Sequence, residues 1–290
     1  MTDETHDPHD RMNERRLLLS LGVSATVLIP AWLRPAIARA ASKHELHQNR
    51  LLAKPRPAEA PLIMLDPGHG GKDPGAIGVA GTYEKHIALM AAHELKNRLE
   101  ASGRYRVSMT RAKDLFIPLE DRVSIAQDRG AHLFVSMHAD SIPDHSVRGA
   151  SVYTLSSNAS DKQTAILAQR ENSSDRFAGP GFKGVTPAIA RILASLVGRE
   201  TRIGSARLQQ DMVDHLANQT DLLTRPARHA AFVVLKSAEI PSVLVEMGFM
   251  SNYKDESALR QYAHRQRITL AMQNAVDAWY IAQKSARMAG

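Results

Sequence analysis

The 290-residue chain contains no cysteine. This absence excludes a disulfide framework, a thiolate zinc site, an iron–sulfur cluster and a cysteine nucleophile. Aromatic residues make up only 5% of the chain, and no run of lysine and arginine reaches five residues, so the sequence argues against a nucleic-acid-binding protein. The 13 histidines are left as the main soft metal ligands.

Long hydrophobic runs are also absent, since the apolar stretch 17–29 is shorter than the roughly 20 residues that span a membrane. The pair Arg15-Arg16 precedes this stretch and Ala38-Arg39-Ala40 follows it, which is the order of a cleavable secretory signal. The paired arginines resemble a twin-arginine export signal. We therefore expect an export signal over 1–40, a periplasmic mature protein and no membrane span after cleavage. The alternative is an uncleaved N-terminal anchor.

Residues 41–61 contain several prolines and predict a short lead or linker. From residue 62 onward, short apolar runs alternate with segments of helical periodicity. This alternation predicts the α/β class: a single three-layer domain over 62–285 with a twisted, mixed, largely parallel central sheet flanked by helices. The expected strands are 62–65, 105–110, 133–137, 150–155, 231–235 and 242–245, and the clearest expected helices are 84–100, 119–129 and 255–282.

Polar residues that can bind a metal follow the expected strands. His69 lies in a glycine-rich turn after the first strand, Glu84 begins the next helix, and His138 and Glu246 end two later strands. In an open α/β sheet, ligands bind beyond the carboxyl ends of parallel strands, so these four side chains can converge on one pocket.

Two imidazoles and one carboxylate make a catalytic zinc set, because three protein ligands leave one position open. His69, Glu84 and His138 suit that task, and Glu246 suits a second carboxylate that accepts a proton from water and passes it to a leaving nitrogen. Each residue alone also has an ordinary interpretation: a turn histidine, a carboxylate at a helix N-terminus, or a solvated loop residue.

Four separated motifs together carry a family resemblance. They are LDPGHGGKDPGA at 65–76, EK at 84–85, SMHA at 136–139 and VLVEMGFMSN at 243–252, with Arg111 and Arg122 between them. In this order they resemble the zinc-dependent N-acetylmuramoyl-L-alanine amidases of the type-3 catalytic family. The likeness covers roughly 62–285.

The resemblance implies one Zn²⁺ ion held by His69, Glu84 and His138, with Glu246 as the catalytic carboxylate. It implies hydrolysis of the amide between N-acetylmuramic acid and L-alanine in peptidoglycan, during cell-wall remodelling or daughter-cell separation. The net charge of +7 suits a polymer whose stem peptides carry carboxylates. Two alternatives remain: another exported zinc peptidase acting on stem peptides, and a non-catalytic cell-wall-binding module.

A helical insertion is expected over about 158–218, which is longer than a simple crossover needs. The resemblance implies that a helix of this insertion blocks the zinc until a protein activator displaces it. Glu171 is the first candidate for the occluding acid, and Asp161 and Glu200 are others. The alternative is a helical flap that only packs on the sheet.

Overall fold

The computed structural model describes residues 60–178 and 186–289. The expected export signal over 1–40 and nearly all of the expected lead over 41–61 lie outside the described residues. Among the described residues, no helix is both long enough and apolar enough to cross a membrane.

Six strands form one central sheet. Their order across the sheet is β2-β1-β3-β6-β4-β5, and every neighbouring pair is parallel except β4 with β6. The expected mixed, largely parallel sheet is therefore confirmed. Because β1, β3 and β6 are parallel, their carboxyl ends meet at one edge. The strands are β1 (Leu62–Pro67), β2 (Arg106–Met109), β3 (Leu133–His138), β4 (Ala150–Leu155), β5 (Leu222–Ala230) and β6 (Ser242–Glu246).

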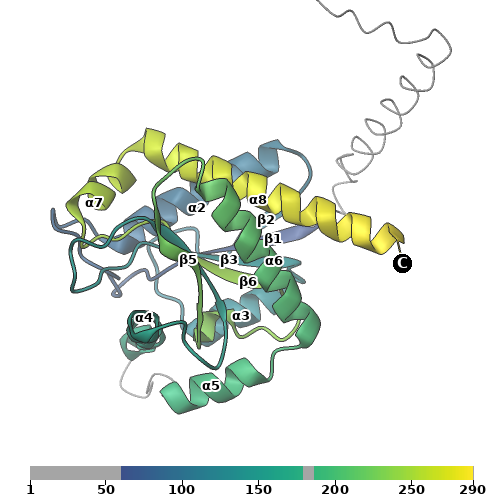
Figure 1. Cartoon of the computed structure of the whole chain (residues 1–290), viewed down its shortest axis with the longest axis horizontal. Coiled ribbons are helices and arrows are strands. Elements are labelled where there is room, and N and C mark those ends of the chain that lie inside the picture. The colour runs from purple at the N-terminus through teal and green to yellow at the C-terminus, as the bar shows by residue number, and fades with distance from the viewer. Residues whose placement is uncertain (1–59, 179–185, 290) are drawn as a thin grey trace, which may run out of the picture. The chain divides into compact units, whose positions relative to one another are not determined.

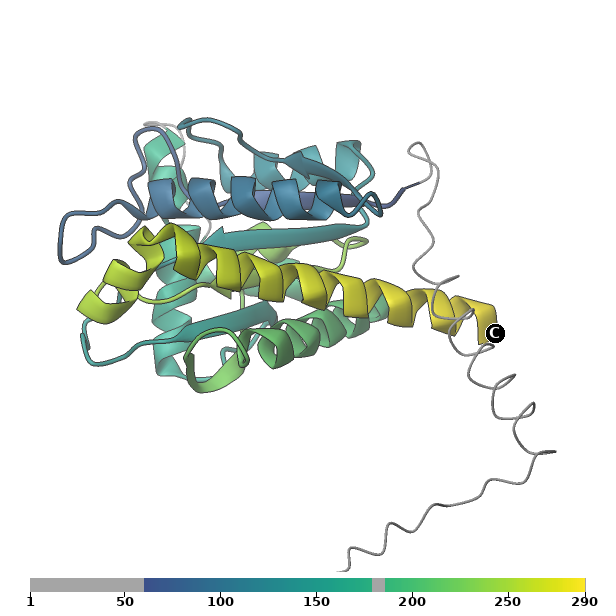
Figure 2. The same ribbon diagram turned by 90° about the horizontal axis from the view of Figure 1, so that it is seen from above.

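Helices cover both faces of the sheet and make the three layers (Figure 1). Helices α2, α6 and α8 lie side by side on one face (Figure 2), and α3, α4 and α5 belong to the other. The α-helices are α2 (Glu84–Ala101), α3 (Leu119–Asp128), α4 (Lys162–Asn172), α5 (Pro187–Ser195), α6 (Arg199–Leu216), α7 (Tyr253–Arg260) and α8 (Tyr262–Ala289). The described residues also form two 3₁₀ turns, η1 (Ser174–Ala178) and η2 (Val233–Leu235).

The core strands are buried on both faces, which explains their nearly continuous apolar sequences. Every residue of β1, β3 and β6 is buried. Helix α2 buries Ile87, Ala91 and Leu95 at helical spacing against the same sheet. Each fully buried large apolar side chain stabilises the fold by about 1.5–3 kcal/mol, so this core holds the strand ends rigidly.

The expected strand over 231–235 is wrong. The strand in this region is β5, which ends at Ala230, and the apolar residues Val233–Leu235 form the 3₁₀ turn η2 in the core. Phe232 packs edge-on against Tyr153, with ring centroids 5.4 Å apart. β5 is an edge strand that includes Pro226, so it carries little of the apolar pattern that marks a buried strand.

Two helical segments also differ in detail from the expectation. Helix α6 lies within the expected insertion, but it buries Leu208 and Met212 in the hydrophobic core beside the sheet. It therefore belongs to one of the two helical layers of the fold. The expected closing helix over 255–282 is divided at Gln261, whose backbone is extended. Arg265 stabilises this break because its guanidinium donates to the carbonyls of the last turn of α7.

Candidate active site

His69 is held in an uncommon backbone conformation directly after β1. Its φ is 60°, in the left-handed region that few non-glycine residues adopt. Two buried arginines hold the surrounding turn: Arg122 donates to the His69 and Pro67 carbonyls, and Arg111 donates to the Pro67 and Gly68 carbonyls. Burial, and then the charge of Arg122, lower the pKa of Arg111 to about 10. The turn therefore aims the imidazole of His69 from a fixed backbone.

Two glycines let the backbone approach the site closely. A Cβ at Gly68 would lie 2.3 Å from the His138 ring, and a Cβ at Gly75 would lie 2.6 Å from the His69 ring and 2.7 Å from Glu84. Only glycine fits at these positions, which explains much of the glycine-rich turn.

Glu84 divides its carboxylate between the two histidines. Its Oε2 lies 3.1 Å from Nε2 of His69, and its Oε1 lies 3.1 Å from Nδ1 of His138. The same oxygens accept hydrogen bonds from the backbone N–H groups of Ala76 and Ala139. The carboxylate is fully buried and therefore fixed in orientation.

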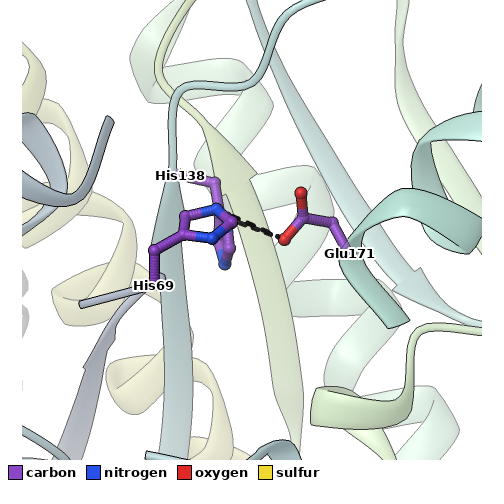
Figure 3. A group of neighbouring side chains, drawn as sticks. All are labelled: His69, His138 and Glu171. Carbon is purple, nitrogen blue, oxygen red and sulfur yellow. Dashed lines mark ion pairs between the residues drawn. The ribbon is translucent and has the colours of Figure 1, made fainter. Parts of the chain in front are cut away.

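Glu171 reaches the same group from α4. Its carboxylate points toward both imidazole rings (Figure 3), with Oε2 3.2 Å from Nδ1 of His138 and 3.6 Å from Nε2 of His69. One ligand atom from each of these three buried residues lies within 4.8 Å of the others. Burial opposes a charged His69, but the carboxylates of Glu84 and Glu171 outweigh it and raise the pKa of the imidazole well above its usual range.

The donor set fits a zinc ion. Four ligands at 2.0–2.2 Å around tetrahedral zinc are separated from one another by about 3.3–3.6 Å. The contacts between the imidazole nitrogens and the carboxylate oxygens of Glu84 and Glu171 span 3.1–3.6 Å. Nε2 of His69 is buried and lacks a hydrogen-bond partner among the described residues, as a metal ligand atom would without its ion.

Glu246 lies beside this cluster at the end of β6. Its Cα is the register partner of His138 on β3. Its Oε2 accepts a hydrogen bond of 2.8 Å from the backbone N–H of Asp140, while its buried Oε1 has no hydrogen-bond partner in the described part of the chain. Burial, followed by the charges of Glu84 and Asp140, raises the pKa of Glu246 well above its ordinary value. The arrangement leaves one oxygen ready to accept a proton.

The structure thus brings His69, Glu84, His138 and Glu246 together, and of the three candidate occluding acids it adds only Glu171. Asp161 caps the N-terminus of α4 and pairs with Arg228. Glu200 is exposed at the start of α6, in a separate cavity of about 580 Å³.

Sequence reasoning gave no role to two further contacts. Oδ2 of Asp73 lies 2.8 Å from Nδ1 of His69, and the spacing of four residues within one turn was a usable signal. Arg170 pairs with the buried Asp140 at 3.0 Å, a contact between distant segments that no local pattern announces.

Comparisons with known proteins agree on one family. A family model described as N-acetylmuramoyl-L-alanine amidase matches residues 63–278. The N-acetylmuramoyl-L-alanine amidase AmiA of Salmonella typhimurium is 37% identical over 93% of this chain and 92% of the relative. AmiC of Neisseria meningitidis is 38% identical over 77% of this chain and 53% of the relative.

Solved structures show the same fold. The N-acetylmuramoyl-L-alanine amidase AmiC2 of Nostoc punctiforme has a TM-score of 0.52 at 27% identity, covering 74% of this chain and 94% of that one. The amidase Ami1 of Mycobacterium smegmatis has a TM-score of 0.57 at 20% identity, covering 76% and 96%.

Proposed function

The chain belongs to the N-acetylmuramoyl-L-alanine amidase family, and on this premise we propose that its site is a zinc centre regulated by its own helix α4. The enzyme hydrolyses the amide between N-acetylmuramic acid and L-alanine in peptidoglycan. In the proposal, His69, Glu84 and His138 hold one zinc ion and Glu246 is the catalytic carboxylate. The close approach of the Glu84 carboxylate oxygens to one nitrogen of each histidine, 3.1 Å in both cases, carries this proposal.

A bound zinc ion would polarise the scissile carbonyl and make a water molecule acidic enough to attack near neutral pH. The chain's own residues supply the rest. Asp73 orients His69 through Nδ1, and Ala76 and Ala139 fix Glu84 through their backbone N–H groups. The free Oε1 of Glu246 accepts the proton of the attacking water and delivers it to the leaving nitrogen.

Helix α4 holds the enzyme in an inactive state in this proposal. The Glu171 carboxylate lies 3.2 Å from Nδ1 of His138 and 3.6 Å from Nε2 of His69, separations that suit ligands of one zinc ion. In this position it takes the place that water and substrate need. Activation then requires that α4 moves away, which an activator protein achieves by binding this helical segment.

Export completes the proposal. Arg15 and Arg16 direct the chain through the twin-arginine route, cleavage follows Ala40, and the mature enzyme acts in the periplasm. Replacing both arginines with lysine should leave the precursor uncleaved inside the cell, and normal periplasmic accumulation of that variant would contradict the assigned route.

Digestion of purified peptidoglycan, with the zinc content measured in parallel, tests the central proposal. The amidase should release intact stem peptides from the glycan, and a chelator should abolish the release. A zinc peptidase would instead free a terminal amino acid, and a wall-binding module would release nothing.

A further inference from the structure

Two neighbouring residues of α4 place opposite charges in the site. The carboxylate of Glu171 faces the imidazoles of His69 and His138. Nη2 of Arg170 lies 3.0 Å from Oδ1 of Asp140, and the same guanidinium donates to the Ser141 carbonyl. The helix thus covers the candidate zinc ligands with an anion and the adjoining acidic residue with a cation.

Hydrolysis of an amide produces the same two charges. The oxygen of water joins the carbonyl carbon, the carbon–nitrogen bond breaks, and both water protons end on the nitrogen. The products near neutral pH are therefore a carboxylate and an ammonium group. For this family they are the lactyl carboxylate of N-acetylmuramic acid and the α-ammonium of the L-alanine that begins the stem peptide.

We propose that Asp140 binds the amine side of the cleaved amide, and that Arg170 occupies this position while α4 is docked. The inference rests on the proposed zinc amidase site and assigns it a leaving-group subsite. In the docked state, Arg170 and Glu171 together imitate the two products.

The surroundings of Asp140 carry this assignment. Its side chain is only 1% exposed, and its Oδ2 has no hydrogen-bond partner among the described residues. Its Oδ1 accepts a hydrogen bond of 2.6 Å from the backbone N–H of Ser141. Arg170 is its only ion-pair partner in the described part of the chain. When α4 leaves, Asp140 loses the guanidinium of Arg170 and keeps an oxygen without a hydrogen-bond partner among the described residues, which an ammonium group can satisfy as a donor.

The position of Asp140 also suits the chemistry. Its backbone N–H holds Oε2 of Glu246 at 2.8 Å, so the proposed proton carrier and the proposed ammonium site are joined by one hydrogen bond. The residue proposed to bind the ammonium is therefore in direct contact with the residue proposed to protonate the leaving nitrogen.

The test removes the charged side chains of Arg170 and Glu171 and measures ligand binding directly. The parent is the double variant Arg170→Gln, Glu171→Ala, loaded with zinc. Calorimetry compares L-alanyl-D-isoglutamine, which has a free α-amine, with its N-acetyl derivative. We expect the parent to bind the free amine at least about tenfold more tightly, and we expect Asp140→Asn in this parent to abolish that preference. Asp144→Asn, an exposed carboxylate of the same loop, should keep it.

Each outcome decides between the proposals. If the parent holds zinc and cleaves peptidoglycan but shows no preference for the free amine, or if Asp140→Asn retains the preference, the subsite is wrong and the amidase site stands. If the parent neither holds zinc nor cleaves peptidoglycan, both proposals are overturned. Asp140→Ser serves as the second variant with the same expected loss if Asp140→Asn does not fold. A purely structural latch between Arg170 and Asp140 would not produce selectivity for a free amine.

Discussion

Oε2 of Glu171 lies 3.2 Å from Nδ1 of His138, although the two residues come from a helix of the insertion and from a core strand. This contact joins the regulatory proposal to the catalytic one, because the same nitrogen is a proposed zinc ligand. Glu171 as a whole residue is only 6% exposed, so solvent does not compete for its place.

Replacing Glu171 with alanine should raise the basal rate of peptidoglycan hydrolysis by about tenfold or more. A tenfold change corresponds to a loss of about 1.4 kcal/mol from the free energy that holds α4 against the site. The reason is that the open position at the zinc becomes accessible to water and substrate. Glu200→Ala is the matched control, since that carboxylate is exposed and belongs to another cavity. Equal basal rates in wild type and Glu171→Ala would mean that α4 does not inhibit.

Glu246→Gln should retain the fold and the zinc ion but lower the hydrolysis rate by about 100- to 10,000-fold. The amide keeps the shape of the side chain and loses the ability to accept a proton. Zinc content and release of stem peptides are measured on the same preparation, with the exposed Glu239→Gln as control. Near-normal activity with full zinc content would falsify the role of Glu246.

Removal of the metal should abolish activity and lower the melting temperature. Ligand binding to the folded state stabilises it, so the apoenzyme loses that contribution. Added Zn²⁺ should restore both properties, whereas Mg²⁺ should not, because a site with two imidazoles favours zinc over a hard cation that prefers oxygen. Full activity in a preparation shown to be free of metal would contradict the zinc centre.

Asp73→Asn should weaken zinc affinity by about 10- to 100-fold, since the carboxylate orients the His69 ring and increases its basicity. Competition with a chromophoric chelator measures the affinity. Asp128→Asn, an exposed carboxylate at the end of α3, provides the control and should leave it unchanged. If both variants bind zinc equally well, Asp73 does not support the ligand.

Arg122→Gln should lower the free energy of unfolding by about 3–5 kcal/mol, because it leaves the buried Asp66 without its ion-pair partner. Denaturant titration measures the loss, and the exposed Arg129→Gln should cost little. A loss of less than about 1 kcal/mol in Arg122→Gln would show that the pair does not anchor the His69 turn.

The same pair makes a pH prediction. Burial raises the pKa of Asp66, but Arg122, Thr110 and Ser136 outweigh it, so the folded pKa lies below the ordinary value. A lowered folded pKa means that this stabilisation is present above the unfolded pKa of about 3.9 and is lost as the pH falls through the folded value. Arg122→Gln removes the main lowering charge, so acid unfolding should begin at a higher pH than in wild type. Identical acid transitions would contradict the assignment.

The sequence by itself determined the α/β class and five of the six strands, because buried strands and amphipathic helices leave regular apolar patterns. It also placed His69, His138 and Glu246 at strand ends and Glu84 at a helix start, since turn chemistry is local. The strand over 231–235 was wrong because burial alone does not distinguish a core 3₁₀ turn from a strand, and the edge strand β5 has little apolar pattern.

Only the tertiary structure decided which of the candidate occluding acids contacts His69 and His138. The sequence made Glu171 the first candidate but left Asp161 and Glu200 open, and of these three acids the packing of α4 brings only Glu171 to His69 and His138. Packing also paired Arg170 with Asp140 and moved α6 into the core. Such contacts depend on where separate segments meet in space, and hydrophobic periodicity specifies which face of a helix is buried but not which distant residue it faces.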